Sequence, residues 1–574
     1  MAPSGVQCSV TLQAVKTFAH QAFKPVHEVL FPMFRRTILI VVLCLLVLAG
    51  RSTAFGLDPR EAGKHADELL SKEMFGGSEG VSHDPLPRAD DQTFLRRVSL
   101  DLIGHPPTAE EITAFSLDTA PDKRAKAVER LLANERFGEN WARYWRDVIF
   151  YRRSEDRALI AGPAVVKMLS EAFNQDPHWD QIAQRFITAT GDVRENGDTA
   201  IIMAQMANAE DTTAEISRIF LGIQIQCAQC HHHPTDRWKR EQFHELAAFF
   251  PRIAVRPLKM GEQRSFEVVS MDRERGKKAD KKPNRGSLEH HMPDLKHPDE
   301  EGKLMQPVFF VTGQKLPAGM SDHERREKIA GWITSRDDRW FAKAFVNRMW
   351  SELVGHGFYE PVDDMGPDRA CSAPRTLDYL ADHFAANQYD VKWLLRAITA
   401  TEAYQRQSRS RFESDQAPFA SNCPQRLRGD QLFNALIEVL GIDDAALPAQ
   451  NKNPRAALAG PRGQVNLTFG YDPSLRRDEI AGSIPQALFL MNGPALNRAL
   501  SGRQITTSLG RLLAETTDDQ AVVEELYLRC LGREATPTEI KTCLDHAHGL
   551  GNRTDAFEDI LWALVNATEF LNRH

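Results

Sequence analysis

Hydrophobic residues recur at intervals of three and four over most of the chain, which is the spacing of a helix with one buried face. In the first half this pattern predicts helices over Ala125 to Leu132 and Trp141 to Phe150. Thr108, followed by Glu110 and Glu111, has the character of a helix start, because a hydroxyl caps free amides and acids favour the first turn. The same pattern predicts a helix over Thr212 to Gln226, with an apolar stripe that leads to Cys227.

The second half repeats the helical pattern after Ser321. Helices are predicted over Glu324 to Ser335, Trp340 to Leu353, Ala373 to Ala386, Val391 to Tyr404, Gly429 to Leu440, Gln520 to Leu531 and Ala556 to Leu571. Residues 445–480 contain four prolines and are predicted to form a loop.

Between the two helical halves the pattern changes to short runs typical of strands. Phe266 to Val269 and Val308 to Val311 are such runs, and a basic stretch from Arg273 to Arg285 lies between them. The basic stretch has no interleaved aromatic residues, so a solvated loop is favoured over a site for a polyanion. The predicted fold class is therefore mainly α, with two helical domains joined by a small β-containing, partly disordered segment.

A chain of 574 residues is too long for one ordinary core. The predicted organisation is an N-terminal extension and signal peptide over 1–54, a helical domain over 55–252, a β-containing linker with the basic loop over 253–320, and a helical C-terminal domain over 321–574.

The N-terminal extension differs from the rest in charge and hydropathy. Arg35 and Arg36 precede an apolar run from Ile38 to Ala49, and the small residues Ser52 to Ala54 follow, in the order of a signal peptide. The run is shorter than the roughly 20 residues of a spanning helix, so no transmembrane helix is expected in the mature chain. Met33 stands directly before this segment and is the expected true start. The chain is predicted to be exported to the periplasm or cell surface.

The overall net charge is −7 although the first 54 residues are basic, so the mature part is acidic. An acidic body without a basic face argues against nucleic acid as a partner. Export also changes the meaning of the six cysteines after residue 54, because free thiols outside the cytosol tend to be oxidised or ligated. Disulfides Cys530–Cys543 and Cys371–Cys423 and buried free thiols are open alternatives.

One short motif carries chemistry: Cys227-Ala228-Gln229-Cys230-His231. With 8 Cys and 19 His in the whole chain, a chance occurrence of this pattern is negligible. In c-type cytochromes, two such thiols form thioethers with haem and the adjacent imidazole ligates its iron. The leading prediction is haem c bound by Cys227, Cys230 and His231, with His231 on the iron, in a protein that exchanges electrons with a partner protein.

Two alternatives remain open for the same segment. A zinc or iron ion needs three or four ligands, which Cys227, Cys230, His233, Asp236 and His244 can supply. A disulfide between the two cysteines needs no metal.

The residues around the motif resemble the planctomycete secreted cytochrome-like family, a domain of unknown function. The resemblance rests on His231 to Trp238 (HHHPTDRW), Ala247 to Phe250 (AAFF), Arg97 to Thr108 (RVSLDLIGHPPT) and Trp141 to Trp145 (WARYW). It spans about residues 60–252. The family's cytochrome label rests mainly on the Cys-x-x-Cys-His motif, and its members occur in genomes rich in sulfatases and polysaccharide-degrading enzymes. A link to envelope or polysaccharide metabolism, with a polysaccharide as a candidate partner, is what the resemblance implies.

The second half resembles the domain that usually follows that family, also of unknown function. The matching segments are Asn347 to Trp350, Gly355 to Gly357, Pro361 to Asp364, Leu377 to Ala381, Ala403 to Gln405 and Gln486 to Gly493. One departure is Ala373-Pro374, where the family usually has His-Pro.

Arg348, Asp363 and Asp364 admit two interpretations, a substrate-binding group or an ion pair that holds a loop to a helix, and the ion pair is favoured. Motifs of the common hydrolases and nucleotide-binding enzymes are missing from the sequence. A structural or hydrolytic metal protein and a non-catalytic envelope scaffold therefore stand beside the redox hypothesis, and whether the chain is an enzyme is left open.

Overall fold

The computed structural model describes residues 57–75, 85–260, 263–272, 288–297, 299–317, 319–409, 417–442, 460–475 and 480–574. The predicted signal peptide and the basic stretch from Arg273 to Arg285 lie outside these residues. Contacts divide the chain into Met1–Asp58 and Pro59–His574, and the following description concerns the second unit.

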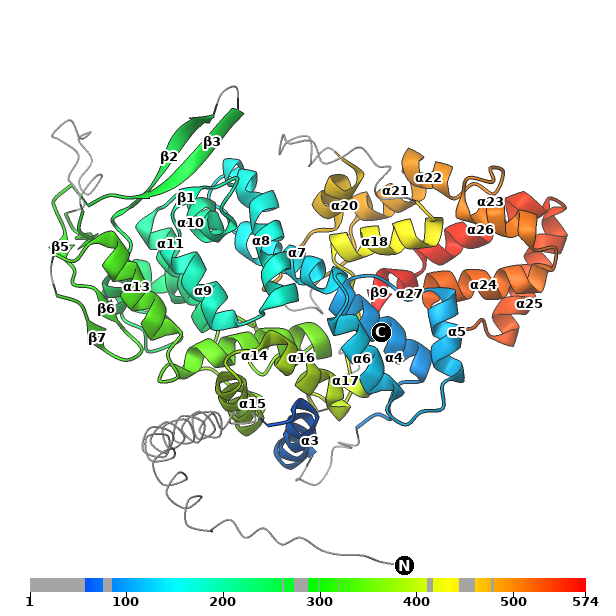
Figure 1. Ribbon diagram of the computed structural model, residues 1–574, viewed down its shortest axis with the longest axis horizontal. Coiled ribbons are helices and arrows are strands. Elements are labelled where there is room, and N and C mark those ends of the chain that lie inside the picture. Colours follow the sequence, from blue (N-terminus) through cyan, green and yellow to red (C-terminus); the bar gives the residue numbers. More distant parts are fainter. Residues whose placement is uncertain are drawn as a thin grey trace, which may run out of the picture. The chain divides into compact units, whose positions relative to one another are not determined.

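The described chain is mainly α, as predicted (Figure 1). Its first half contains α3 (Pro59–Leu70), α4 (Asp91–Ile103), α5 (Ala109–Leu117), α6 (Lys123–Leu132), α7 (Arg136–Phe150), α8 (Gly162–Gln175), α9 (Trp179–Thr188), α10 (Ala200–Ala204), α11 (Ala209–Ile216) and α12 (Arg240–Ala247). Short 3-10 or π-helical turns are η1 (Ser71–Phe75), η2 (Asp156–Ala161), η3 (Gly197–Thr199), η4 (Ser217–Leu221) and η5 (Ile225–Gln229).

The second half contains a further series of helices. They are α13 (Asp322–Ile333), α14 (Arg339–Val354), α15 (Pro374–Ala386), α16 (Val391–Ala400), α17 (Glu402–Gln405), α18 (Gly429–Leu440), α20 (Pro461–Phe469), α21 (Ile484–Asn492), α22 (Pro494–Ala499), α23 (Ser508–Glu515), α24 (Asp519–Leu531), α25 (Pro537–Leu550), α26 (Arg553–Asn566) and α27 (Thr568–Leu571).

The strands are short and form small antiparallel sheets. They are β1 (Gly191–Asp192), β2 (Ile253–Met260), β3 (Gln263–Ser270), β4 (His291–Met292), β5 (Lys303–Leu304), β6 (Val308–Phe309), β7 (Gln314–Lys315), β8 (Gln425–Arg426) and β9 (Asn572–Arg573). The largest sheet has the order β1-β3-β2, with Val255 opposite Val268. The two strand-like runs of the sequence become β3 and β6, which confirms their prediction.

Several helix boundaries differ from the predicted ones because a local cap ends the helix. The helix predicted up to Tyr404 breaks at Thr401, whose hydroxyl accepts the amide of Tyr404 and so starts α17. The C-terminal helix predicted up to Leu571 breaks at Ala567, which has extended backbone and makes no side-chain cap. The predicted loop over 445–480 contains α20, which begins with Pro461 in the first turn, where proline is favoured.

The start signal at Thr108 is confirmed. The Thr108 hydroxyl accepts the amide of Glu111, and the Glu111 carboxylate accepts the amide of Thr108, which is a complete capping box at the start of α5.

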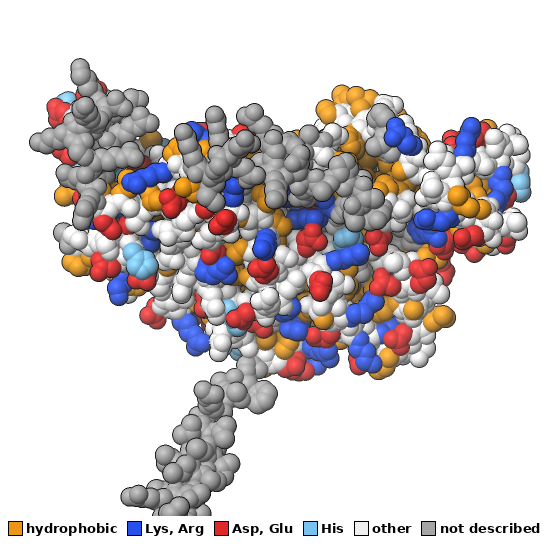
Figure 2. Space-filling view, turned by 45° about the horizontal axis from the view of Figure 1, so that its top comes forward, with side chains coloured by type: hydrophobic (Ala, Val, Ile, Leu, Met, Phe, Trp, Pro, Cys, Tyr) orange, Lys and Arg blue, Asp and Glu red, His pale blue; other side chains and the backbone are white. Residues whose placement is uncertain are grey.

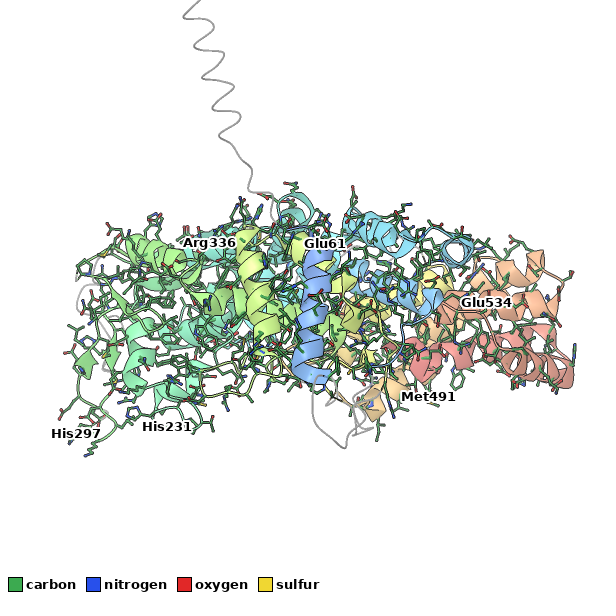
Figure 3. All side chains as sticks on the ribbon, turned by 90° about the horizontal axis from the view of Figure 1, so that it is seen from below. Glu61, His231, His297, Arg336, Met491 and Glu534 are labelled. Carbon is green, nitrogen blue, oxygen red and sulfur yellow. The ribbon has the colours of Figure 1, made fainter. Side chains whose placement is uncertain are left out.

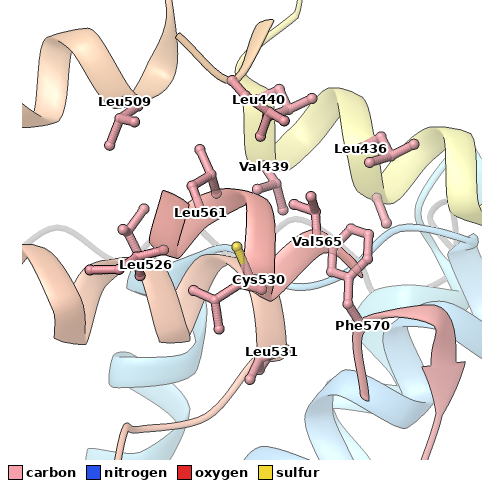
Figure 4. Close-up of a cluster of buried hydrophobic side chains, with 14 of the residues drawn as sticks. Leu436, Val439, Leu440, Leu509, Leu526, Cys530, Leu531, Leu561, Val565 and Phe570 are labelled. Atoms are coloured by element: carbon pink, nitrogen blue, oxygen red, sulfur yellow. The ribbon is translucent and has the colours of Figure 1, made fainter. Parts of the chain in front are cut away.

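Two cores use residues from both halves of the chain. An aromatic group joins Trp145 of α7, Trp179 of α9 and Phe345 of α14, with ring centroids 4.3 Å apart between the two tryptophans and 4.7 Å apart between Trp179 and Phe345. The C-terminal core contains buried side chains of α18, α23, α24, α26 and α27, and Leu100 of α4 belongs to it (Figure 4). The domain boundaries at 252 and 320 stay predictions. Buried side chains from both halves pack together in the same two cores.

Buried polar contacts also join the halves. The hydroxyl of Tyr404 donates to Asp101 of α4 at 2.8 Å, and Arg573 of β9 forms an ion pair with the same carboxylate at 2.8 Å. Segments that carry the sequence resemblance in each half therefore contact each other directly. Within the described residues, no helix has both the length and the apolar character needed to cross a membrane.

Candidate functional site

The helix that leads to the motif ends before it. The apolar positions Ile216, Ile219, Phe220 and Ile223 are buried as predicted, but η4 ends at Gly222, so the prediction of one helix up to Gln226 is wrong. Gly222 has a φ of +68°, and a Cβ there would lie 2.6 Å from the sulfur of Met365. Only glycine fits both the left-handed backbone and this close approach.

The motif instead begins on η5, a separate 3-10 turn that ends at Gln229, and Cys230 follows as its C-cap. Ile225 and Ala228 of η5 are fully buried and anchor the turn, whereas Cys227 and Cys230 are exposed. Residues three apart lie on the same side of a 3-10 helix, so the turn directs both cysteines outward together. Both are free thiols in this structure. His231 follows directly, is exposed and points away from the protein (Figure 3).

The three successive histidines differ in the atom that each offers. The Nδ1 atom of His231 lies 2.7 Å from the carbonyl oxygen of His232. A carbonyl only accepts, so this Nδ1 carries the proton and Nε2 keeps its lone pair. His232 and His233 are opposite, because their Nδ1 atoms accept the amides of Arg240 at 3.2 Å and Thr235 at 3.4 Å. Their protons therefore lie on Nε2, and His231 alone of the three presents an Nε2 lone pair.

The residues of the alternative ion site have other contacts. His244 is buried at 1% exposure, and its Nε2 atom lies 3.0 Å from the carbonyl oxygen of Gln229. One carboxylate oxygen of Asp236 accepts the amide of Arg237 at 2.7 Å, and the other is buried without a hydrogen-bond partner. In the part of the chain that the structure describes, no three His, Cys, Asp or Glu side chains are arranged to hold a metal ion. The structure thus does not gather Cys227, Cys230, His233, Asp236 and His244 into one ligand set.

A loop from the second half of the chain, residues 363–368, contacts the segment that carries the motif. The amide of Met365 donates to the carbonyl of Gly222 at 2.8 Å, and Arg237 pairs with Asp368 at 2.7 Å. The side chain of Gln224, directly before η5, donates to Asp363 at 2.8 Å. The segment 222–237 is therefore fixed at both ends by residues 363–368.

Asp363 is the centre of a buried ion cluster. It is fully buried and lies 3.0 Å from the guanidinium of Arg218 and 3.3 Å from that of Arg348. Arg218 also pairs with Glu215. The favoured interpretation of Arg348 as part of a structural ion pair is confirmed for Asp363. Asp364 instead pairs with Arg369 at 2.9 Å, in a partly exposed position.

Sequence reasoning missed Arg218, Gln224 and His290 as supports of the motif. Arg218 carried a weak signal, because it stands three residues after Glu215 beside the apolar stripe that leads to the motif. Gln224 and His290 carried none, because their partners are distant in sequence. Among the described residues, the other four cysteines form no disulfide: Cys423 and Cys530 are buried, and burial raises the pKa of the Cys371 thiol to about 11.

The helix that begins after Ala373, where the family usually has His-Pro, is capped by a distant residue. Ala373 is fully buried at the start of α15, and the first amides of this helix, those of Arg375 and Thr376, donate to the carboxylate of Glu73 at 2.7 and 3.0 Å. Glu73 therefore supplies the cap that α15 needs.

Charge on the surface is mixed. On the face drawn in Figure 2, Lys and Arg side chains alternate with Asp and Glu side chains over the described residues. This face therefore offers no field of a single sign to steer a strongly charged partner.

The pair His244–His290 predicts a stability that depends on pH. Burial lowers the pKa of both imidazoles to about 4, with neighbours His291 and Arg240 adding to the effect and Glu210 acting against it. Because a histidine in the unfolded chain titrates near 6.5, unfolding takes up protons between about pH 6.5 and pH 4. The free energy of unfolding should fall as the pH decreases through this window. In His290→Gln the slope of the free energy of unfolding against pH should correspond to about one proton fewer per chain, as measured by urea unfolding at several pH values. An unchanged slope would contradict the assignment.

These features define a class: a mainly helical chain with an exposed Cys-x-x-Cys-His turn in its first half and a supporting loop from its second half. Two family models match the chain in that order. Residues 77–255 match PSCyt2, described as a protein of unknown function (DUF1549), and residues 325–462 match PSD1, also described as a protein of unknown function (DUF1553). The chain thus carries the domain pair that the sequence resemblance predicts. No curated protein and no solved structure matched it.

Proposed function

We propose that the chain is an exported, cytochrome-like redox protein that binds haem c through Cys227, Cys230 and His231. The observation that supports this best is the difference between the three histidines. An iron ligand must present an unprotonated nitrogen, and His231 alone of the three directs such an Nε2 outward beside two exposed thiols. The residues present therefore fit covalent haem.

The roles of the chain's own residues follow from this geometry. Cys227 and Cys230 would hold the group by thioether bonds, and the exposed turn leaves room for it. The carbonyl of His232 would hold the ring of His231 in one orientation and increase the basicity of Nε2, as hydrogen bonds to ligand imidazoles do. When bound, haem supplies an iron that takes up and releases one electron, for exchange with a partner redox protein.

The decisive experiment is to produce the chain with its own leader in a host that attaches haem c. We expect about one haem per chain that survives acid-acetone extraction, with the Soret band retained by the protein. Cys227→Ala and Cys230→Ala should abolish double attachment. Cys543→Ala is the matched control, because this partly buried thiol packs against the C-terminal core, and it should retain the haem. A wild-type chain without a Soret band after extraction overturns the proposal.

A single ion is the second candidate, and one observation favours it. An Asp236 carboxylate oxygen is buried without a hydrogen-bond partner among the described residues, which leaves it available to bind a cation. Elemental analysis of the purified chain decides between the two, since this candidate requires close to one equivalent of zinc or iron without porphyrin.

A further inference from the structure

The central carbonyl of the Cys-x-x-Cys turn is held by two side chains of one helix. The carbonyl oxygen of Gln229 lies 3.2 Å from Nε of Arg240 and 3.0 Å from Nε2 of His244. Arg240 is the first residue of α12 and His244 stands four residues later, so both lie on the same face of that helix. Two hydrogen bonds converge on one acceptor, which can take both because it has two lone pairs.

Both donors are in turn fixed by the segment around β4. The Nη2 of Arg240 donates to the carbonyl of Pro293, and Nδ1 of His244 lies 2.9 Å from Nε2 of His290. The donor and the acceptor in each of the histidine hydrogen bonds follow from the carbonyl of Gln229, which can only accept. His244 must carry its proton on Nε2, so its Nδ1 accepts from the Nε2–H of His290. The chain of donors therefore runs from His290 through His244 to the turn.

We propose that Arg240 and His244 are positioning residues for the cofactor site, which hold the Cys227–Cys230 turn through the carbonyl of Gln229. This role rests on the proposed haem function. Ala228 and Gln229 separate the two cysteines, and the carbonyl of Gln229 belongs to the peptide bond with Cys230. A rotation of that peptide group therefore changes the direction of the Cys230 thiol relative to the Cys227 thiol. With both nitrogens of His244 engaged inside the protein, His244 supports the turn from behind and is not itself a ligand.

The positioning has a physical consequence for attachment. Two thiols must reach two points of one rigid group at the same time, and a site held in advance loses less conformational entropy when it does so. Without the two hydrogen bonds, η5 has only Ile225 and Ala228 as buried anchors. The turn would then populate several directions of Cys230, and double attachment would become rare.

The test uses three substitutions in the full chain. His244→Ala removes the donor. His244→Gln restores it, because the glutamine amide nitrogen occupies nearly the position of Nε2. His105→Ala is the matched control, since His105 is another buried histidine, which pairs with Glu438 away from the motif.

Two readouts separate this inference from the proposed function. Hydrogen exchange of the amides of residues 225–231, without cofactor, should be about 10-fold faster in His244→Ala and near wild type in the other two. The fraction of chains with two thioether bonds, measured by mass spectrometry, should fall about 10-fold in His244→Ala and recover in His244→Gln.

Each outcome has a distinct meaning. Unchanged exchange in His244→Ala overturns the positioning role. Faster exchange with undiminished double attachment also overturns it, because the held turn would then not serve the cofactor. If the wild type itself attaches no haem, the proposed function fails, and the exchange result still decides whether His244 holds the turn.

Discussion

Asp363→Asn should destabilise the protein by about 3–5 kcal/mol, because it removes the counter-charge that two buried guanidinium groups share, although Arg218 keeps its ion pair with Glu215. Arg218 and Arg348 are each 3% exposed at their side chains. The asparagine keeps one oxygen for Gln224, but its NH2 group replaces the oxygen that accepts from both guanidinium groups, so the change removes the charge together with two hydrogen bonds. The first measurement is the free energy of unfolding from urea titration. The second is the rate of amide hydrogen exchange of residues 222–231, which should increase because Asp363 also supports the motif.

The neighbouring Asp364→Asn is the matched control. Its ion pair with Arg369 is about one quarter exposed on both sides, where such pairs contribute about 0–1 kcal/mol. Equal losses in the two variants would show that the buried cluster has no special role.

The acid dependence of Asp363 follows from the same contacts. Burial alone would raise its pKa, but Arg218 and Arg348 outweigh burial and hold the pKa at about 2. The unfolded carboxyl titrates near 3.9, so this stabilisation is complete above that value and is lost as the pH falls toward 2.

His231→Ala should weaken cofactor retention, whereas His233→Ala should leave it unchanged. Loss of His231 removes the only outward Nε2 lone pair of the three histidines, so the binding of a haem iron by this segment should weaken by about 10-fold or more. His233→Ala should leave the haem content intact and at most shift the reduction potential, because its Nδ1 accepts the amide of Thr235 and its Nε2 carries a proton. The measurements are the haem content per chain, the absorption spectrum of the reduced protein and the midpoint potential.

The paired design also tests the single-ion alternative. If an ion is bound by Cys227, Cys230, His233 and Asp236, then His233→Ala should lose about 10-fold or more in metal affinity. Full cofactor loss in His233→Ala with retention in His231→Ala would overturn the assignment of His231.

The local pattern predicted most helices well and their ends less well. Helix α18 has the predicted bounds, because a continuous apolar face and a glycine after Leu440 define it locally. The break at Thr401 was missed because the threonine both fits the helical pattern and can cap a new helix. The amide that it exposes, that of Glu402, is also satisfied from outside, by Asp67 at 2.8 Å. That contact spans more than half the chain, and no local pattern contains it.

For the site, the sequence located the motif, but its predicted helical setting was wrong. The end at Gly222 depends on the close approach of Met365, which comes from the second half of the chain. Similarly, His244 was a candidate ligand by residue type, and only its contacts with Gln229 and His290 show that both of its nitrogens are engaged.

The sequence by itself determined the mainly helical class, the order of the two domains and the place of the Cys-x-x-Cys-His turn, because periodicity and short motifs are local properties of the chain. The tertiary structure decided which of three adjacent histidines directs a lone pair outward and which buried charges support the turn. The histidines are set by hydrogen bonds within residues 231–240. The buried charges depend on desolvated ion pairs between distant residues, such as Arg218 and Asp363, which are 145 positions apart. Their energies arise only when folding excludes water from both partners.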